Sequence, residues 1–392
     1  VVYVFINLTS VLWLGSLAIN ALTGLDLFYG LIILAAFSLA YSLFGGLKAV
    51  AMTDVVQVVL LIFGGLAVSF IALNTISESS GVFNGLKIVF NEMPEKFDMI
   101  LSADNPSYKN LPGIWILIGL GVWIGHFFYW GFNQYITQRA LGAKSIKEAQ
   151  KGVMFAAYLK LLMPIVIVLP GICAAVLFPV LEKSDQAYPT MMSLLPNGLL
   201  GLTFAALIAA IVSSLASMSN SISTIFTMDI YRYFQKNDRG QAHLIKIGRS
   251  TVVVSLIIAT LIAKPLLGSF DSIFQYIQNF TGYFSPGIVV IFLVALFWKK
   301  ATSMSVIFAA VISLVGSIFI SGSYPDLPFI HRMTIVFLMS AFGCWLVTYI
   351  QGYKDQEKAI DLSNIDFSTT KAFNINTAIV VITLGLIYVS LA

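Results

Sequence analysis

The sequence predicts an all-α polytopic membrane protein, and three observations lead to that prediction. Of the 392 residues, 58% are apolar or aromatic and only 10% are Asp, Glu, Lys or Arg. Soluble domains carry about 25% charged residues, so this chain could not cover an aqueous surface, and its apolar content is too high for disorder. The apolar residues recur in runs of roughly 20, enough for a helix to cross a ~30 Å hydrocarbon layer. Basic residues gather in alternate connections between these runs.

Each apolar run is expected to form one helix of a single integral membrane domain that covers 1–392. About eleven helices are expected, at 1–22, 27–47, 54–75, 113–134, 153–178, 198–228, 244–263, 271–297, 302–321, 332–351 and 372–391. Of the 22 Lys and Arg residues, 15 lie in one alternate set of connections and six, Arg332 among them, lie in the other. Basic connections stay in the cytoplasm, so residue 1 is predicted to be cytoplasmic and residue 392 extracytoplasmic.

Two connections are long enough to be considered separately. Segment 76–112 is expected to be an extracytoplasmic loop, and its amphipathic stretch GVFNGLKIVFNEMPEKF is either a short helix over the outer mouth or a solvated connector. Segment 352–371 is expected to be a charged cytoplasmic linker before the last helix. The chain begins with Val1 inside an apolar run, so further sequence is expected upstream.

The sequence lacks the motifs of enzymatic, redox or nucleic-acid chemistry. It contains no P-loop, HExxH, Cys/His metal set or serine-hydrolase elbow. The balance of 22 basic against 18 acidic residues is too even to indicate nucleic acid. No enzyme and no organic cofactor are expected. The candidate functional groups are instead the polar residues inside the spans, because an unpaired polar group in hydrocarbon costs several kcal/mol.

The first polar cluster lies in WIGHFFYWGFNQY. His126, Tyr129, Trp130 and Asn133 are spaced i, i+3, i+4, i+7 and would share one face of an α-helix. Aromatic rings flanked by an imidazole and an amide suit a neutral polyhydroxylated ring, which packs its C–H face on the aromatics. A Tyr/Trp belt at the membrane interface would give a similar pattern.

Two ionisable residues also occur in or beside spans. Lys160 lies about 10 Å above the inner end of its helix at 1.5 Å per residue, where it either faces a polar cavity or snorkels to the interface. Asp54 begins a span, where it is expected to cap the helix, to line an ion path, or to do both.

A third feature is the segment IFQYIQNFTGYFSPG. Gln275, Gln278 and Asn279 occupy one side of a helix that is expected to break at Gly282 and Pro286. Interrupted helices expose backbone dipoles at the midplane, where transporters bind substrate.

Small residues form the fourth cluster, in AALIAAIVSSLASMSNSIST. Ala210, Ser213, Ser214 and Ser217 again follow i, i+3, i+4, i+7. Such spacing allows close helix approach, which is one interpretation. Paired hydroxyls beside a backbone carbonyl are also the neutral oxygen ligands that Na⁺ accepts. The polar residues by themselves therefore indicate a solute transporter.

Five segments resemble one family closely: FYWGFNQYITQRALGAKS, KGVMFAAYLKL, AAIVSSLASMSNSISTIFTMDIY, FQYIQNFTGYFSPGI and ALFWKKATS. They are similar to the sodium/glucose cotransporters of the solute:sodium symporter family, in particular its bacterial sodium/galactose symporters. The resemblance implies a leucine-transporter-type core of two inverted repeats of five helices, with extra helices at the ends. It also implies that the first two core helices are missing from this chain.

The resemblance assigns roles to the polar residues. Tyr129 would be an intracellular gate stacking on the sugar beside Trp130, with Asn133 and Gln275 in support. Lys160 and Gln278 would contact sugar hydroxyls, and His126 stands where a family member has a sugar-binding Asn. Sodium would be held by the Ala210 carbonyl and by Ser213 and Ser214, with Asp54 on its inward exit path.

The implied function is sodium-coupled uptake of a hexose such as galactose, glucose or mannose by alternating access. The expected partners are Na⁺ as the co-transported ion, a monosaccharide and the lipid bilayer of the plasma membrane, and the sequence does not predict the oligomeric state. Symport of another solute (sialic acid, myo-inositol or an amino acid) is one alternative. A membrane sugar sensor that does not transport is the other.

Overall fold

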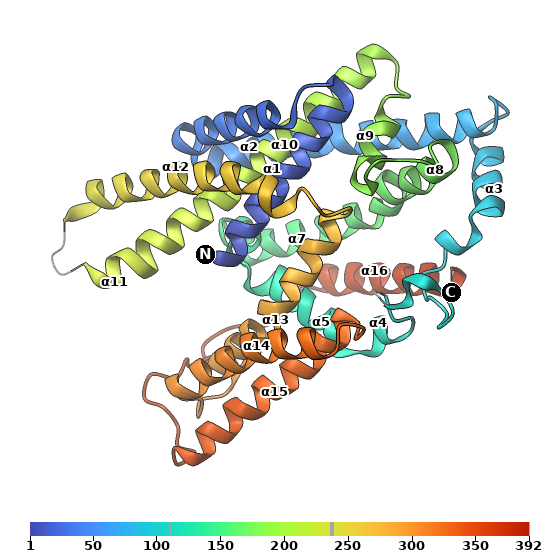
Figure 1. Cartoon of the computed structure of the whole chain (residues 1–392). Helices are drawn as coiled ribbons and strands as arrows, with labels where there is room; N and C mark the ends of the chain where they lie inside the picture. The colour runs from blue at the N-terminus through green and yellow to red at the C-terminus, as the bar shows by residue number, and fades with distance from the viewer. Residues whose placement is uncertain (110, 236–238, 392) are drawn as a thin grey trace. The chain divides into compact units, whose positions relative to one another are not determined.

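The computed structural model describes residues 1–109, 111–235 and 239–391, with the backbone alone at 46–51, 106, 109 and 117. Lys236 and the side chain of Lys48, which are two of the 15 basic residues counted in the predicted cytoplasmic connections, lie outside the described part. The described chain is helical and contains no strand. The helices that form most of its long apolar segments are α1 (Val2–Thr23), α2 (Leu27–Ile76), α7 (Ile146–Leu161), α8 (Leu169–Leu177), α10 (Asn197–Ile225), α12 (Gly240–Leu267), α13 (Ile273–Phe297), α14 (Ser303–Ser323), α15 (Phe329–Ile350) and α16 (Lys371–Ser390) (Figure 1).

Shorter helices connect or extend the long ones. The α-helical ones are α3 (Val82–Glu92), α4 (Trp115–Ile118), α5 (Leu120–His126), α6 (Gln134–Leu141), α9 (Ala187–Met192) and α11 (Arg232–Phe234). Three π-helical turns are η3 (Phe127–Phe132), η4 (Pro164–Val168) and η6 (Phe226–Tyr231). Three 3₁₀ turns are η1 (Pro94–Lys96), η2 (Pro106–Lys109) and η5 (Ser184–Gln186).

Ten helical segments of the described chain are long and apolar enough to cross a membrane. The predicted span 113–134 is the exception, because it is divided among α4, α5 and η3. Gly119, between α4 and α5, has extended backbone angles of φ −75° and ψ 149°. Its amide donates a hydrogen bond to the Trp115 carbonyl. A Cβ at Gly119 would lie 2.4 Å from the Trp115 carbonyl oxygen, so the tight turn there depends on glycine.

The helix assigned as α2 contains two apolar segments, Leu27–Phe44 and Met52–Ile76. The Tyr41 and Thr53 hydroxyls are hydrogen-bonded although they are 12 residues apart. In a straight α-helix that separation would be about 18 Å. The two segments therefore turn back on each other, as the two separate predicted spans require.

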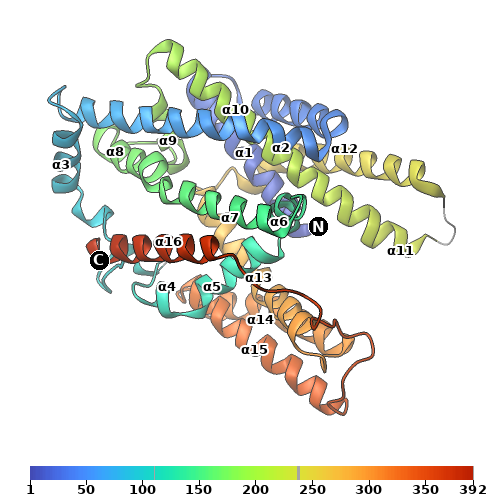
Figure 2. The same ribbon diagram turned by 180° about the vertical axis from the view of Figure 1, so that it is seen from behind.

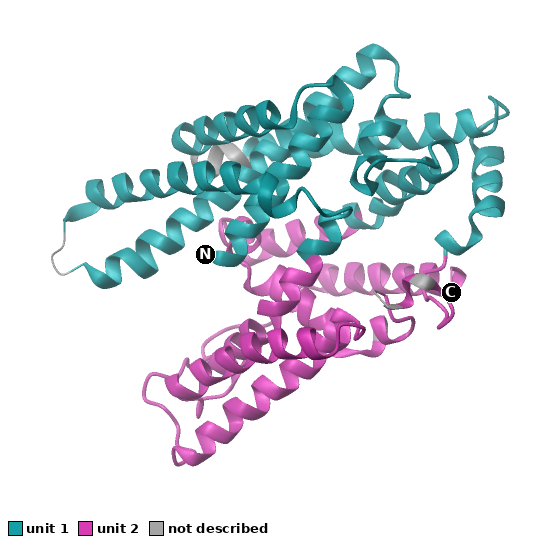
Figure 3. Ribbon diagram, viewed as in Figure 1, with its two compact units in different colours: residues 1–97, 159–277 teal, residues 98–158, 278–392 magenta. Residues whose placement is uncertain are grey.

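The chain divides into two compact units, 1–97 with 159–277 and 98–158 with 278–392 (Figure 3). In the first unit, α1, α2, α10 and α12 pack against one another (Figures 1 and 2). Gly64 of α2 faces Thr203 of α10 so closely that an added Cβ would lie 2.5 Å from the Thr203 Cγ2 atom. Asp54 of α2 contacts Ser213 of α10. Ten residues separate the paired positions on each helix, so the second segment of α2 and α10 run antiparallel.

In the second unit, α13 packs against α14. The Gly287 amide donates to Ser313 Oγ at 2.9 Å, and Ser317 Oγ donates to the Tyr283 carbonyl at 3.5 Å. The predicted break at Gly282 and Pro286 is wrong: α13 is one helix from Ile273 to Phe297, with Pro286 inside it. Hydroxyls of α14 satisfy backbone groups near the proline, and this compensation keeps the helix continuous.

The two long connections differ in structure. Within 76–112, the amphipathic stretch forms α3, and its C-terminal end continues into the 3₁₀ turn η1. Segment 352–370 contains no helix in the described chain. Asp361 in this segment lies 3.5 Å from the Lys299 amine, and hydrogen bonds from Ser363 lower the pKa of the Asp361 carboxyl. Local contacts of this kind order the linker without regular structure.

We expect Gly64→Ala to destabilise the first unit, because overpacking a close helix contact costs about 1–3 kcal/mol. Thermal unfolding of the purified protein measures the change. Gly201→Ala is the matched control: Gly201 lies in α10 with no atom within 4 Å of an added Cβ, so there alanine's higher helix propensity gives an equal or higher Tm. Adding Thr203→Ala should restore most of the loss. Equal Tm changes in the two glycine variants would contradict the contact.

Candidate functional site

The contact between Asp54 and Ser213 brings together two of the predicted site residues. Ser213 Oγ donates a hydrogen bond to Asp54 Oδ1, across 159 positions of sequence. Ser213 is 2% exposed and Asp54 is half-buried. Asp54 lies in the first turn of the second apolar segment of α2, Met52–Ile76, so its predicted role as a helix cap stays a prediction. A half-buried carboxylate beside a hydroxyl row makes an electronegative position between two helices.

The remaining predicted sodium ligands lie within one turn of Ser213 on α10. Ala210 and Ser214 are both half-buried. A hydroxyl that donates to a carboxylate keeps its oxygen lone pairs available to accept. Ala210, Ser213 and Ser214 therefore offer carbonyl and hydroxyl oxygens, and Ser213 contacts a carboxylate. Oxygen ligands of this kind are hard donors that suit an alkali cation.

The aromatic cluster is not the single α-helical face that its spacing predicts. His126 ends α5, Tyr129 and Trp130 lie in the π-helix η3, and Asn133 leaves the helix with φ −94° and ψ 113°. A π-turn takes more residues per turn than an α-helix, so the i, i+3, i+4, i+7 relation no longer holds beyond His126. Apolar packing holds the turn in place, because Phe132 stacks on Phe292 of α13 with ring centroids 4.5 Å apart.

The rings of the π-turn still form one aromatic group. The Tyr129 ring meets Trp130 edge-on at 5.0 Å and Tyr135 edge-on at 6.2 Å. Trp130 is 47% exposed and Tyr129 is half-buried. Asn133 is buried, and its amide nitrogen has no hydrogen-bond partner among the described residues. Such an orphaned donor is costly, so Asn133 is a candidate for contact with a ligand or water.

The other predicted sugar contacts lie on α7 and α13. Lys160 is exposed at the C-terminal end of α7, next to the π-turn η4. Gln275 and Gln278 are exposed on α13, and neither side-chain amide has a partner among the described residues. Lys160 and Gln275 belong to the first unit, whereas Gln278 and the aromatic group belong to the second.

Polar contacts outside the spans hold the start of α13 to the first unit. The Ile273 amide donates to Asp185 Oδ2 at 2.7 Å, and Ser184 Oγ donates to Asp271 Oδ2 at 2.7 Å. Burial raises the pKa of Asp185, partly opposed by the Ile273 amide. Hydrogen bonds from Ser184 lower the pKa of Asp271. These contacts fix the helix end that precedes Gln275.

Comparisons with known proteins identify the family. The model of the sodium:solute symporter family matches residues 1–304. The sodium/glucose cotransporter of Vibrio parahaemolyticus is 45% identical over 406 aligned positions, which cover 98% of this chain and 74% of that protein. The chain belongs to the sodium:solute symporter family. Sodium is accordingly the ion that the symporter co-transports, and the family consists of transporters, not enzymes.

More distant relatives agree with this assignment. Human sodium/myo-inositol cotransporter 2 is 31% identical over 76% of this chain and 48% of its own length. Sheep sodium/glucose cotransporter 1 is 32% identical over 81% of the chain and 52% of its own. The symporter thus spans about half the length of these mammalian relatives.

A solved structure confirms the fold class. The substrate-bound outward-open state of a Na⁺-coupled sialic acid symporter matches with a TM-score of 0.73 and 21% identity, over 89% of this chain and 72% of that one. At that identity the likeness shows the fold alone. The symporter is thus an all-α, multi-pass protein of the plasma membrane with a leucine-transporter-type architecture.

Sequence reasoning missed a buried polar cluster around Arg332. Arg332 was placed in an extracytoplasmic connection, but it lies in the first turn of α15 and is only 6% exposed. Its guanidinium donates to Ser321 Oγ at 2.9 Å and lies 4.5 Å from the centre of the Tyr283 ring. It also donates to the Asn279 carbonyl at 3.4 Å. In the sequence Arg332 is followed directly by an apolar run, but its partners Tyr283 and Ser321 lie on other helices, so no local pattern predicted the cluster.

We expect Tyr283→Leu to destabilise the symporter more than Tyr283→Phe does. Phenylalanine keeps the ring under the guanidinium and loses the 2.7 Å hydrogen bond from the Tyr283 hydroxyl to Ser321, worth about 1 kcal/mol net. Leucine also removes the cation–π contact, worth about 2 kcal/mol when desolvated. The measurement is thermal unfolding of both variants in the native and Arg332→Met backgrounds. A Leu–Phe difference that survives in Arg332→Met would show that the ring serves packing alone.

Proposed function

We propose that the chain carries out sodium-coupled symport of a monosaccharide by alternating access. The observation that carries the proposal is the hydrogen bond of Ser213 to Asp54, which supports a sodium site at these residues in a chain of a sodium-coupled family. Sodium would bind at Ala210, Ser213 and Ser214, with Asp54 supplying negative charge beside them and receiving the ion on its way inward.

Support for a sugar substrate comes from the exposed polar and aromatic groups. Trp130 and Tyr129 present ring area, and sugars pack their C–H faces on such rings. Gln278 is exposed on α13, and its amide can donate and accept at once, as a hydroxyl requires. The 45% identical relative is named a sodium/glucose cotransporter. We therefore assign His126, Tyr129, Trp130, Lys160 and Gln278 to sugar contact, with Asn133 and Gln275 in support.

Coupling in this proposal is thermodynamic. If sodium and sugar both bind the outward-open state more tightly than the inward-open state, each raises the affinity for the other by the same factor. Sodium released into a low-sodium cytoplasm then allows the sugar to leave. The basic connections at 135–152 and 229–249 place the release side in the cytoplasm by the charge rule. Segment 76–112 would lie outside, and 352–371 would lie inside.

The proposal is tested by uptake of one labelled hexose into proteoliposomes containing the purified symporter. Uptake should require an inward sodium gradient and should fall when unlabelled galactose, glucose or mannose is added. If sialic acid or proline competes and hexoses do not, the sugar assignment is wrong, and Lys160 would instead pair with a carboxylate of the substrate. Myo-inositol competition alone would point to a polyol instead. Binding without accumulation would indicate a sensor.

We expect Ser214→Ala to weaken sodium activation of uptake with little change in Tm. The lost hydroxyl is a ligand that water replaces poorly inside the protein, while alanine keeps the helix packing. The sodium concentration for half-maximal uptake should rise about tenfold, as for loss of a hydrogen bond to a charged group. Ser219→Ala on the same helix is the control, because Ser219 is buried and its hydroxyl has no hydrogen-bond partner in the described part of the chain. The same sodium activation in both variants would contradict the site.

His126→Asn should change the preference among hexose epimers more than the total uptake. Epimers differ in the direction of one hydroxyl, and an imidazole and an amide present their donor and acceptor differently. Leaving a buried polar group unpaired costs about 1–3 kcal/mol, or roughly five- to hundredfold in selectivity. Parallel uptake of galactose, glucose and mannose measures it. A uniform fall for all three sugars would mean that His126 supports the helix and does not select the sugar.

A further inference from the structure

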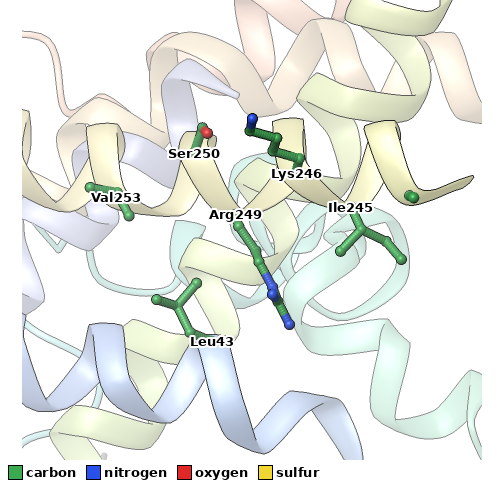
Figure 4. A pocket seen from close by; sticks show the side chains of 7 residues that line it. Leu43, Ile245, Lys246, Arg249, Ser250 and Val253 are labelled. Atoms are coloured by element: carbon green, nitrogen blue, oxygen red, sulfur yellow. The ribbon is translucent and has the colours of Figure 1, made fainter. Parts of the chain in front are cut away.

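Two adjoining hollows lie beside α12 in the first unit, outside the proposed transport residues. The basic hollow, of about 280 Å³, lies where α12 faces the first segment of α2 (Figure 4), and it is lined by Leu43, Ala242, Ile245, Lys246, Arg249, Ser250 and Val253. The hydroxyl hollow, of about 360 Å³, reaches α10 and η6, and it is lined by Ser42, Leu43, Asn220, Ser223, Thr224, Thr227, Met228, Leu244, Ile245, Gly248, Arg249 and Val252. Arg249 lines both.

The charge of this region is positive and uncompensated. Lys246 and Arg249 form no ion pair among the described residues, and no acidic residue lines either hollow. Figure 4 shows the Arg249 guanidinium extending from α12 toward the side of Leu43, while Lys246 points away from it on the other side of the same helix. An anion held at Arg249 would find a second cation one helical turn away on a long, mobile side chain.

The hydroxyl hollow contains polar atoms that lack partners. Thr227 is 5% exposed, and its Oγ1 has no hydrogen-bond partner among the described residues. Ser42 Oγ is buried and likewise unpartnered. Ser223, by contrast, donates to the Gly248 carbonyl at 2.9 Å. Buried hydroxyls without partners are costly, so Thr227 and Ser42 point to a ligand that accepts hydrogen bonds.

The outer wall of the hollows is apolar and faces outward. Ile245 is 57% exposed and Met228 is 44% exposed. Further along α12, away from the basic end, Val254, Ile257 and Leu261 are also exposed. A polar, cationic recess that opens onto an apolar helix flank matches a molecule with an anionic head and hydrocarbon tails. A soluble anion would not need that flank.

We propose that the hollows at Arg249 bind the phosphate headgroup of an anionic phospholipid of the inner leaflet. Arg249 pairs with the phosphate, Thr227 and Ser42 donate to its oxygens or to the glycerol, and the acyl chains lie along the exposed flank of α12. The basic connection before α12 is on the side predicted to be cytoplasmic, where anionic lipids and basic pockets between helices meet. The site lies outside the proposed sugar and sodium ligands.

The test is thermal unfolding of the purified full chain in detergent, titrated with phosphatidylglycerol or with phosphatidylcholine of the same acyl chains. The symporter should be stabilised by phosphatidylglycerol at concentrations where phosphatidylcholine has little effect. Arg249→Gln should raise the titration midpoint about tenfold, as for loss of a charge-assisted hydrogen bond, and Thr227→Val about fivefold. Arg249→Lys should lie between native and Arg249→Gln.

Lys264→Gln is the matched control, because Lys264 is an exposed cation at the opposite end of α12 and its loss should leave the midpoint unchanged. If Lys264→Gln and Arg249→Gln raise the titration midpoint equally, the lipid effect depends only on general surface charge and the proposal is wrong. Equal stabilisation by the two lipids would also overturn it. Inorganic phosphate or glycerol 3-phosphate should not replace the lipid, and a full effect from either would assign the hollows to a soluble anion instead.

Discussion

A backbone amide or carbonyl that faces hydrocarbon without a partner costs several kcal/mol, and this constraint governs where the chain departs from regular α-helix. Besides the extended residue Gly119, the described chain has three π-turns inside or beside spans, and these keep backbone groups bonded within the helix while they change the direction of the side chains. One π-turn carries Tyr129 and Trp130, another begins four residues after Lys160, and the third follows α10. The chain can thus redirect functional side chains while its backbone stays satisfied.

Where a helix breaks depends on its neighbours, and for that reason the sequence could predict the spans better than their interruptions. Hydropathy is a local property, and ten of the expected spans correspond to membrane-length helices. Pro286 removes a backbone donor from α13 wherever it is placed, yet Ser313 of α14 bonds the adjacent Gly287 amide and the helix continues. Segment 113–134 has no internal proline, yet Gly119 adopts an extended conformation and divides it. The continuity of α13 thus depends on a neighbouring helix, and the break at Gly119 depends on a close backbone approach to Trp115 that hydropathy does not report.

The candidate site shows the same division between local and long-range information. The spacing of Ala210, Ser213 and Ser214 predicts that these residues share one helix face, and by itself it is compatible with close helix packing or with sodium ligation. The contact of Ser213 with Asp54 joins residues 159 positions apart, and no periodicity encodes it. Arg332 was misplaced for a similar reason: only the ring of Tyr283 and the hydroxyl of Ser321 make its burial tolerable.

The chemistry of the proposed sodium ligands fits an ion that must leave again. A resident cation is held best by several carboxylates in a rigid cage, since each adds charge and fixed geometry. Here hydroxyl and carbonyl oxygens on one helix lie beside a single carboxylate on another. The Ser213 hydroxyl donates its hydrogen bond to Asp54. A transported ion requires binding that is favourable enough to enter and weak enough to release. Because Asp54 and Ser213 lie on different helices, a small separation of α2 from α10 would change the number of oxygens around the ion. Gly64 and Thr203 form a close contact ten residues along the same antiparallel pair, so a tilt that pivots at this contact would separate Asp54 from Ser213.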